Sequence, residues 1–383
     1  MTTRYGNEAE LSAKEIYKEI AKESSTYQAE IEGKKLLFHN ASNVLSLNPI
    51  EKFVELIINS EDIGYKRTGK TIRNGKSIVE FKGLALKLYF KKIRSFILTV
   101  YSHESFYIYS EHVILFMEAC KELQLSSDMF YDCNFYFEKF EKYEAELFND
   151  LIILIRSKSR TEEFKKKVSN RKSNSTRMFK SITDYIEGLF AQRSRLLVIR
   201  IDLGYLVSVD GCGEFRQNVT LEQVTADFDR FIRNMRHNSI FKNLYGYIWK
   251  LEYGEQKGYH YHLILFFKGS EQEKDVHIGF QVGNYWMKNI TSNRGIFFNC
   301  NAKKGEYTHL GIGMIDINAE SYADLRFNLN YYVVQYFTKN EQYLKIKLTE
   351  KYRVIGKGEV PMKSNNAGRP RLANRVEQVL IGV

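Results

Sequence analysis

The stretch Tyr245–Phe267, YGYIWKLEYGEQKGYHYHLILFF, decides the fold of the second half of this chain. Its first nine residues are rich in aromatic and β-branched side chains, which favour strands. The five residues GEQKG have the composition of a turn, and the last nine residues have strand character again. The pattern therefore predicts a β-hairpin.

The hairpin brings together side chains that can bind a metal ion. Because side chains alternate between the faces of a strand, His260 and His262 point the same way. If the turn is centred near Gln256, Glu252 lies opposite His260 on that face. Two imidazoles and a carboxylate are a ligand set for a divalent metal. The alternative is a strand with two ordinary histidines on its polar face; Glu252 in register and the apolar end of the second strand favour the metal site.

Composition sets the class of protein. The chain has 383 residues, enough for two domains, and 44% hydrophobic residues with 3 prolines, which indicates a globular fold. A net charge of +11 favours a polyanionic partner, nucleic acid before a membrane surface. The 4 cysteines are scattered without a C-x-x-C pair, which predicts neither a zinc cage nor a disulfide framework and fits a reducing cytoplasm.

No targeting or membrane segment is expected. The N-terminus, MTTRYGNEAELSAKE, is polar and charged from its start, unlike a signal peptide. No apolar run approaches the roughly 18–20 residues needed to cross a bilayer. The sequence thus predicts a cytoplasmic protein without a membrane partner.

Residues 1–156 are predicted to form a mostly helical N-terminal region of unknown role. Helical character is expected over residues 9–31, 111–123 and 130–155. The basic, turn-rich stretch GYKRTGKTIRNGKSIVEF predicts a short hairpin around Asn74-Gly75.

Residues 157–180 differ in composition from both flanks. They carry nine Lys or Arg against two Glu, with several Ser and Asn, which predicts a basic linker or mobile arm between two domains. Such cations either contact DNA phosphates or are simply solvated, and the sequence leaves both interpretations open. The candidate DNA-binding residues are Lys165, Lys166, Lys167, Arg171 and Lys172.

Residues 181–360 are predicted to be the functional domain. A strong strand, LLVIRIDLGYLV over residues 196–207, precedes the hairpin, and helices are expected over residues 221–237 and 320–339. This irregular order predicts an α+β fold with a central antiparallel β-sheet flanked by helices. Residues 361–383 are expected to be a basic, solvated tail, although Gly368-Arg369-Pro370-Arg371 has the look of a minor-groove-binding core.

The last predicted helix, ESYADLRFNLNYYVVQYFTKN, carries a second group of reactive residues. Tyr332 and Tyr336 are four residues apart and Lys339 is three further on, so all three share one helical face. In one interpretation the tyrosines only border the apolar stripe of the helix. In the other, an ammonium and a metal stabilise a tyrosine phenolate, whose unperturbed pKa is about 10, and the phosphate that it attacks.

The order of these motifs resembles the HUH endonucleases that start rolling-circle replication. The segments IWKLEYGEQKGYHYHLILFF and YYVVQYFTK are closest to the two-tyrosine, inovirus-type replication proteins of filamentous phages and bacterial prophages. The strand LLVIRID is similar to the first motif of that family, and Arg353–Gly358 to the basic, glycine-containing end of its domain. The resemblance covers roughly residues 190–360.

The resemblance implies a ferredoxin- or RRM-like core that nicks and rejoins single-stranded DNA at a replication origin. A tyrosine would form a 5′-phosphotyrosyl link and leave a 3′-OH that primes synthesis. Because the chain has no G-x-x-x-x-G-K-[ST] motif, a helicase as well as a polymerase would come from the bacterial host. The implied site consists of Tyr332 and Tyr336 as nucleophiles, Lys339 as charge stabiliser, and Glu252, His260 and His262 as ligands of Mg²⁺ or Mn²⁺.

Several alternatives remain open at this point. The chain could be a relaxase or transposase of the same superfamily, or a catalytically inactive protein that only binds DNA. Tyr331 adjoins Tyr332 and would become the nucleophile if the helix shifted by one residue. Asp202 is expected to be a strand-end residue rather than a polar contact near the metal, and His277 and His309 are expected to be structural or surface histidines. The N-terminal region is a candidate for binding origin DNA, on the basis of its charge and position.

Overall fold

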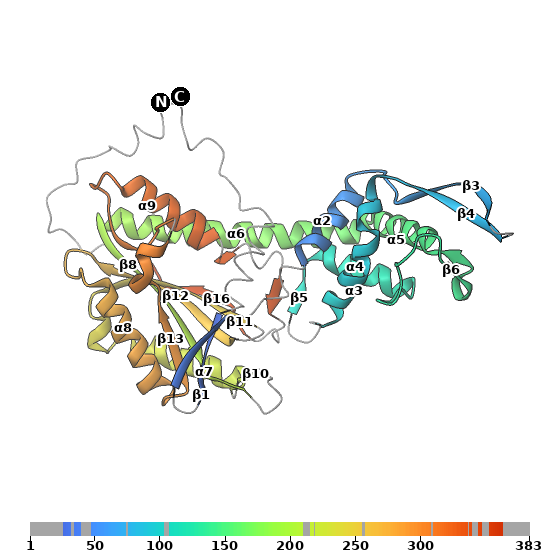
Figure 1. The fold of residues 1–383 in the computed structure, drawn as a ribbon. Coiled ribbons are helices and arrows are strands. Elements are labelled where there is room, and N and C mark those ends of the chain that lie inside the picture. The colour runs from blue at the N-terminus through green and yellow to red at the C-terminus, as the bar shows by residue number, and fades with distance from the viewer. Residues whose placement is uncertain are drawn as a thin grey trace, which may run out of the picture.

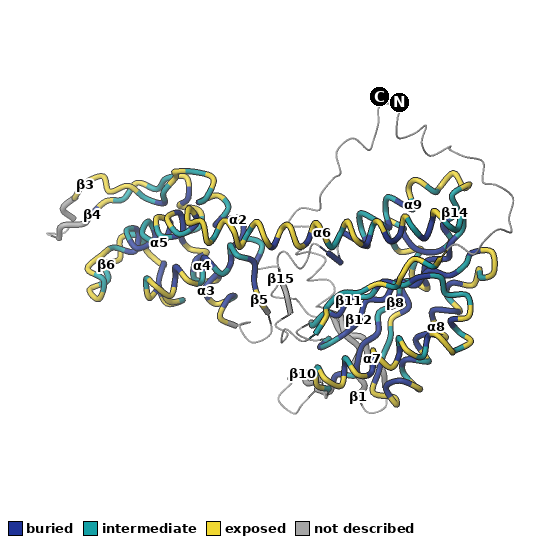
Figure 2. Tube along the Cα trace, turned by 180° about the vertical axis from the view of Figure 1, so that it is seen from behind, coloured by how far each residue is buried: buried dark blue, intermediate teal, exposed yellow. Residues whose placement is uncertain are grey.

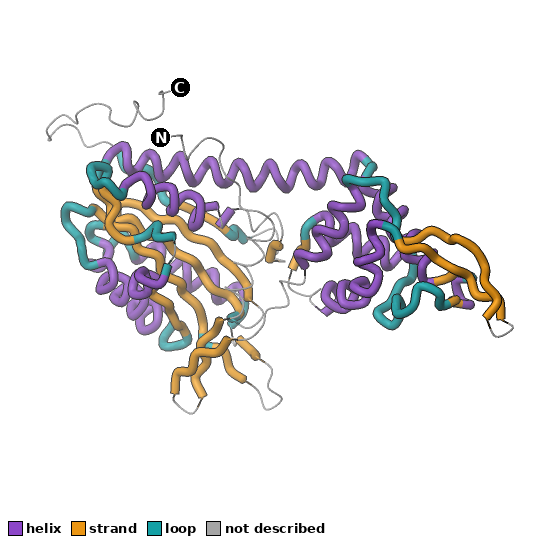
Figure 3. Tube along the Cα trace, turned by 45° about the horizontal axis from the view of Figure 1, so that its top comes forward, coloured by secondary structure: helices purple, strands orange, loops and turns teal. Residues whose placement is uncertain are grey.

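The protein consists of two lobes connected by one long helix (Figure 1). The computed structural model describes residues 26–31, 34–39, 47–73, 76–102, 107–209, 215–217, 219–254, 257–307, 309–335, 337–338, 344–346 and 352–362. The N-terminal lobe is mainly helical, and the C-terminal lobe is built on an antiparallel sheet flanked by helices (Figure 3). The predicted α+β class, with its central antiparallel sheet and mainly helical N-terminal region, is therefore confirmed.

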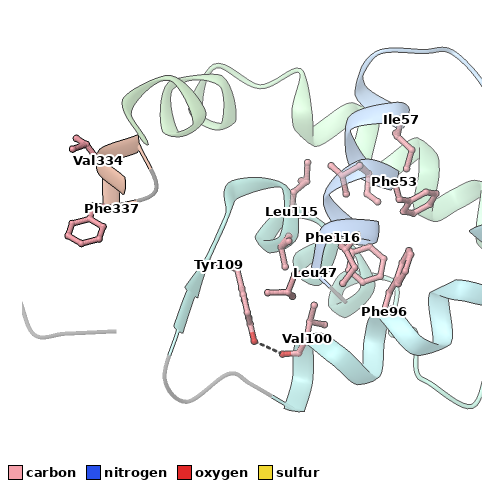
Figure 4. Close-up of a cluster of buried hydrophobic side chains, with 14 of the residues drawn as sticks. Leu47, Phe53, Ile57, Phe96, Val100, Tyr109, Leu115, Phe116, Val334 and Phe337 are labelled. Atoms are coloured by element: carbon pink, nitrogen blue, oxygen red, sulfur yellow. Dashed lines mark hydrogen bonds between the residues drawn. The ribbon is translucent and has the colours of Figure 1, made fainter. Parts of the chain in front are cut away.

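The N-terminal lobe packs its helices around aromatic side chains. Figure 4 shows Phe53, Phe96 and Phe116 in contact, next to Tyr109, whose hydroxyl donates a hydrogen bond to the carbonyl oxygen of Val100 at 3.3 Å. The elements of the lobe are α2 (Leu47–Ile58), β3 (Tyr65–Arg73), β4 (Lys76–Gly83), η2 (Ala85–Lys92), α3 (Ile93–Ser102), β5 (Tyr107–Tyr109), α4 (Glu111–Glu122), β6 (Tyr136–Phe137), η3 (Glu138–Phe140), β7 (Lys142–Tyr143) and α5 (Glu144–Ser159).

Two expected helices of this half differ from the structure. The helix expected over residues 130–155 begins only at Glu144, because Phe130 and Glu141 adopt left-handed backbone angles (φ 68° and 52°) that interrupt a helix. Residues 26–31, expected to end a helix, form strand β1 (Thr26–Ile31), and the preceding 25 residues lie outside the described part. The hairpin expected around Asn74-Gly75 is confirmed, since Arg73 pairs with Lys76.

The basic segment between the lobes is a regular helix. Helix α6 (Glu162–Gln192) runs for 31 residues and begins at Thr161, whose side chain accepts a hydrogen bond from the backbone of Phe164. The prediction of a mobile arm over residues 157–180 is therefore wrong. Its turns between the lobes are mostly exposed (Figure 2), so this part lacks the continuous apolar stripe by which a helix is recognised in a sequence.

The main sheet of the C-terminal lobe is antiparallel throughout. Its strand order is β13-β8-β12-β11-β16, and β14 pairs with the first part of β8. The strands are β8 (Arg195–Tyr205), β11 (Leu244–Gly254), β12 (Gly258–Lys268), β13 (Gly295–Asn299), β14 (Gly313–Asp316) and β16 (Ile355–Lys357). A smaller sheet has the order β10-β9-β1-β2 and contains β2 (Lys34–His39), β9 (Val207–Val209) and β10 (Phe215–Gln217); β15 (Leu344–Ile346) pairs with β5.

Helices cover both faces of the main sheet. The helical elements of this lobe are α7 (Leu221–Asn234), η4 (Ser239–Phe241), α8 (Asp275–Tyr285), the π-helical η5 (Trp286–Ile290), η6 (Cys300–Glu306), α9 (Tyr322–Asn328) and the π-helical η7 (Leu329–Val334). Odd-numbered side chains of β8 and β12, such as Leu263, pack against α7 and α8. Even-numbered ones, such as Ile264, pack against α6 and η7.

One hydrophobic core runs through both lobes. It extends from Leu47 in α2, along α6, to the even-numbered face of the sheet and Phe337. The hydroxyl of Ser175 in α6 also donates a hydrogen bond to the carbonyl oxygen of Thr338 at 3.0 Å. Helix α6 thus positions the chain after η7 over the sheet. Within the described residues, no helix is both long and apolar enough to cross a membrane.

The contact between α6 and β11 depends on a glycine, which yields a first prediction. A Cβ atom at Gly246 would lie 2.5 Å from the Tyr185 hydroxyl and 2.6 Å from Leu189, whereas one at Gly69 in β3 meets nothing within 4 Å. We expect Gly246→Ala to lower the free energy of unfolding by about 1–3 kcal/mol because α6 must move away from the sheet. Urea unfolding of this variant beside Gly69→Ala measures the difference. Equal losses in the two variants would contradict the close packing.

Candidate metal centre

The strand pairing aligns the predicted ligands as expected. In the hairpin of β11 and β12, Glu252 pairs with His260, and Gly254 pairs with Gly258. The predicted alignment of Glu252 with His260 is therefore confirmed. Across the other edge of β12, His262 pairs with Asp202 of β8. All four side chains extend from the even-numbered face of the sheet.

Glu252, His260 and His262 converge on one point. One ligand atom from each lies within 4.8 Å of those from the other two. The Glu252 Oε2 atom is 3.2 Å from His262 Nε2 and 3.9 Å from His260 Nε2. Ligand atoms held about 2.0–2.2 Å from an ion lie roughly 3–4 Å apart, and the two distances from Glu252 to the histidines fall in that range.

His260 has a nitrogen atom that lacks a hydrogen-bond partner. Its Nδ1 atom lies 3.0 Å from the carbonyl oxygen of Gly258, and because a carbonyl only accepts, Nδ1 carries the proton. The Nε2 atom then bears a lone pair, and among the described residues no group hydrogen-bonds to it although it is buried. Burial, with the charges of His262 and Lys257, lowers the pKa of His260 to about 4, so the imidazole is neutral at pH 7. A buried, neutral imidazole nitrogen is suited to bind a metal.

His262 is held between two carboxylates. Its side chain is fully buried, with Nδ1 2.6 Å from Asp202 Oδ1 and Nε2 3.2 Å from Glu252 Oε2. If Nδ1 carries the proton and donates a hydrogen bond to Asp202, the lone pair of Nε2 faces the lone pairs of Glu252. Two such atoms need a shared proton or a cation between them.

Asp202 corrects an expectation. It was expected to be a strand-end residue, but it lies inside β8 and contacts His262. Burial alone would raise the pKa of Asp202, yet the charges of His262 and Arg200 hold that pKa well below its usual range. A carboxylate that accepts a hydrogen bond from the ring N–H of a ligand histidine fixes the tautomer and orientation of the imidazole, and it is a usual outer partner of a metal-binding imidazole.

A buried lysine balances the carboxylates. The Lys250 side chain is 1% exposed, and its Nζ atom is 2.9 Å from Glu252 Oε1. Burial alone would raise the pKa of Glu252, but the charges of Lys250 and His262 hold that pKa well below the usual range of carboxyl groups. Glu252 is thus ionised, with Oε1 turned to Lys250 and Oε2 to the two histidines.

Phe337, which follows η7 in the chain, lies beside this cluster. The ring of Phe337 is buried, with its centroid 5.7 Å from that of His262. Tyr332 lies five residues earlier, in the π-helical η7, and its ring stacks on His309 with centroids 3.8 Å apart. Tyr336 and Lys339 are outside the described residues.

The other candidates have different surroundings. Tyr331 stacks on Phe327 with a centroid distance of 5.1 Å. His277 is exposed on α8, on the opposite side of the sheet, and His309 is exposed beside Tyr332. His309 therefore belongs to the surroundings of the tyrosine, which its isolated position in the sequence did not indicate.

The five predicted DNA-binding residues occupy different environments on α6. Lys165 and Lys167 pair with Glu162 and Glu163 at 2.8 Å and 2.7 Å. Lys166 and Lys172 are exposed. Arg171 is buried and donates a hydrogen bond to the carbonyl oxygen of Ile108 at 3.2 Å and another to that of Tyr109, which corrects its expected role: it fixes β5 to α6.

Comparison with known proteins assigns a family. The profile of the YagK/YfjJ C-terminal domain matches residues 157–357, which include α6, the whole main sheet and η7. The chain belongs to this family. No curated protein matches the chain, and no solved structure matches it.

The charge balance of the cluster yields a second prediction. We expect Lys250→Met to lower the free energy of unfolding by about 3–5 kcal/mol in EDTA, because it leaves the buried Glu252 carboxylate without its cation. Lys268→Met is the control, since Lys268 forms a more exposed pair with Glu271 at 3.6 Å and its loss should cost at most about 1 kcal/mol. Chemical unfolding of both variants tests this. A Lys250→Met protein as stable as the control would show that Glu252 is not held ionised in this way.

Proposed function

We propose that this protein is a metal-dependent endonuclease that nicks and rejoins single-stranded DNA through a tyrosine, as the HUH initiators of rolling-circle replication do. The observation that carries the proposal is the convergence of the partly exposed Glu252 with the buried His260 and His262, where the neutral His260 Nε2 atom has no hydrogen-bond partner among the described residues. An unpaired buried polar atom is costly, and a cation would remove that cost.

Glu252, His260 and His262 would hold the ion, with Asp202 orienting His262. Mg²⁺ or Mn²⁺ fits a mixed nitrogen and oxygen ligand set, and when bound it would polarise the scissile phosphate. Lys250 keeps Glu252 ionised. The apolar rows of the sheet below the cluster, including Ile264 and Phe266, hold the strands in register and thereby fix the ligand spacing.

The reaction would transfer a phosphoryl group to a tyrosine and back. The phenolic oxygen of Tyr332 or Tyr336 would attack the phosphorus and give up its proton to solvent. The bond from phosphorus to the 3′-oxygen would break, and that oxygen would take up a proton. The products are a 5′-phosphotyrosyl link and a free 3′-OH. The reverse attack by a 3′-OH rejoins the strand, and Lys339 would stabilise the phenolate. Two tyrosines allow a second cleavage before the first link is resolved.

The position of Tyr332 favours this role. It lies in a π-helical turn, a rare conformation that is frequent at functional sites. Phe337, five residues further along the chain, contacts His262. The net charge of +11 favours a polyanionic substrate such as DNA at a replication origin, with the helicase and polymerase supplied by the host.

The proposed metal role of the cluster gives a third prediction. We expect Asp202→Asn to weaken Mn²⁺ binding by about 10- to 100-fold, because an amide no longer fixes the tautomer of His262 as a carboxylate does. Isothermal titration calorimetry of the metal-free protein measures this without DNA. Asp184→Asn on the exposed face of α6 is the control and should bind as the wild type does. Absence of Mn²⁺ binding in the wild type would overturn the metal site.

The tyrosines give a fourth prediction. On single-stranded oligonucleotides that tile candidate origin DNA, the wild type should form a covalent protein–DNA adduct with Mn²⁺ and none with EDTA. The adduct should persist in Tyr332→Phe or Tyr336→Phe alone and disappear in the double variant, because either phenol can attack. Denaturing gels measure the adduct, with Tyr331→Phe as the matched control.

The outcomes separate the alternatives. Loss of the adduct in one single variant would indicate one dominant tyrosine, as in a single-tyrosine relaxase or transposase. An adduct that survives in the double variant would assign the nucleophile elsewhere, with Tyr331 next. DNA binding without any adduct would favour a catalytically inactive DNA-binding protein.

A further inference from the structure

The hairpin of β3 and β4 projects from the end of the N-terminal lobe that is farthest from the main sheet (Figures 1 and 3). Its register runs from Tyr65 paired with Gly83 to Arg73 paired with Lys76, and a bulge interrupts it between Arg67 and Gly69. The described side chains over residues 66–70 are exposed. The hairpin is called here the basic ribbon, and its Lys66, Lys70 and Lys82 side chains are open to solvent.

The basic ribbon concentrates positive charge. Residues 65–83 contain six Lys or Arg and one Glu, a net charge of +5 out of +11 for the whole chain. Arg67 pairs with Glu146 at 3.7 Å, so part of this charge is balanced within the lobe. Within the described part of the chain, no carboxylate lies within 4.0 Å of the ammonium groups of Lys66, Lys70 or Lys82.

Two of these lysines lie directly opposite one another. Lys66 in β3 is the register partner of Lys82 in β4. Like charges at directly opposed positions of an antiparallel pair destabilise it. The repulsion between these two lysines does not stabilise the fold. A polyanion bound along the ribbon would relieve it.

The base of the ribbon is fixed to the lobe. The Asn149 side chain in α5 accepts hydrogen bonds from the backbone of Gly64 and Tyr65, both at 3.0 Å, and donates one to the carbonyl oxygen of Tyr65 at 2.7 Å. The rings of Phe81 and Tyr143 are in contact at 5.4 Å. The ribbon is therefore held in place rather than attached as a loose arm.

We propose that the basic ribbon binds the phosphate backbone of duplex DNA. A two-stranded β-ribbon fits the major groove of B-DNA, which is about 12 Å wide, whereas the major groove of RNA duplexes is too narrow and deep for side chains. Lysines on both strands then face the phosphates on either side of the groove. This inference does not depend on the nickase, because it concerns another lobe and another form of DNA.

The test compares two full-length triple variants with equal net charge. One carries Lys66→Gln, Lys70→Gln and Lys82→Gln; the control carries Lys121→Gln, Lys242→Gln and Lys288→Gln, three exposed lysines outside the ribbon. Fluorescence anisotropy measures binding to a labelled duplex, and to one of its strands alone, in EDTA over a range of salt concentrations. Thermal melting of each protein verifies folding, and the ribbon variant should melt at or above the wild-type temperature because the repulsion is removed.

We expect the ribbon variant to bind the duplex roughly 10- to 100-fold more weakly at about 100 mM salt, with the slope of log K against log salt reduced by about 3. The control should retain wild-type duplex affinity, and single-strand binding should change little in either protein. Equal losses in both variants would reduce the effect to net charge and overturn the proposal. So would unchanged duplex binding in the ribbon variant, or a larger loss for the single strand. A protein that binds duplex through the ribbon but forms no tyrosine adduct would uphold this inference while the nickase fails.

Discussion

The main constraint on this structure is a buried imidazole, His262, between the carboxylates of Asp202 and Glu252. Each of these groups comes from a different strand, so the hydrogen bonds exist only while β8, β12 and β11 stay in register. A slip of one residue would turn every side chain to the opposite face and leave charged groups among the apolar residues under α7 and α8. The polar cluster and the apolar core therefore specify the same strand pairing.

The helix α6 depends on the same arrangement. Its C-terminal half packs on the even-numbered face of the sheet, the face that carries the cluster, and its N-terminal half joins the core of the helical lobe. Through Ser175 it also holds the chain at Thr338, next to Phe337 and thus close to His262. At 1.5 Å per residue, its 31 residues span about 46 Å, so the two lobes are far apart along the helix yet share one hydrophobic core.

This separation gives the protein two surfaces of different character. The cluster is buried, nearly balanced in charge, and composed of groups whose positions several strands fix. The basic ribbon has exposed lysines and carries an excess of cations on a hairpin that is anchored at its base. The cluster is suited to bind a small cation and to position reactive groups, and the basic ribbon is suited to bind a long polyanion. A regular helix between them keeps both at a defined spacing.

The sequence alone determined the features that depend on local geometry. Alternation along a strand and the length of one turn were enough to predict that Glu252 faces His260, and the glycine in Asn74-Gly75 was enough to predict the hairpin of β3 and β4. The partners of His262 required the tertiary structure. Asp202 is 60 residues away in sequence, and only the pairing of β8 with β12 brings it within 2.6 Å. The same holds for α6, whose polar middle conceals its helical period, and for Arg171, whose charge suggested DNA but whose burial against β5 depends on how the lobes pack. The local sequence determines which side chains of a strand point to the same face. Contacts between distant segments determine which groups lie next to a buried charge.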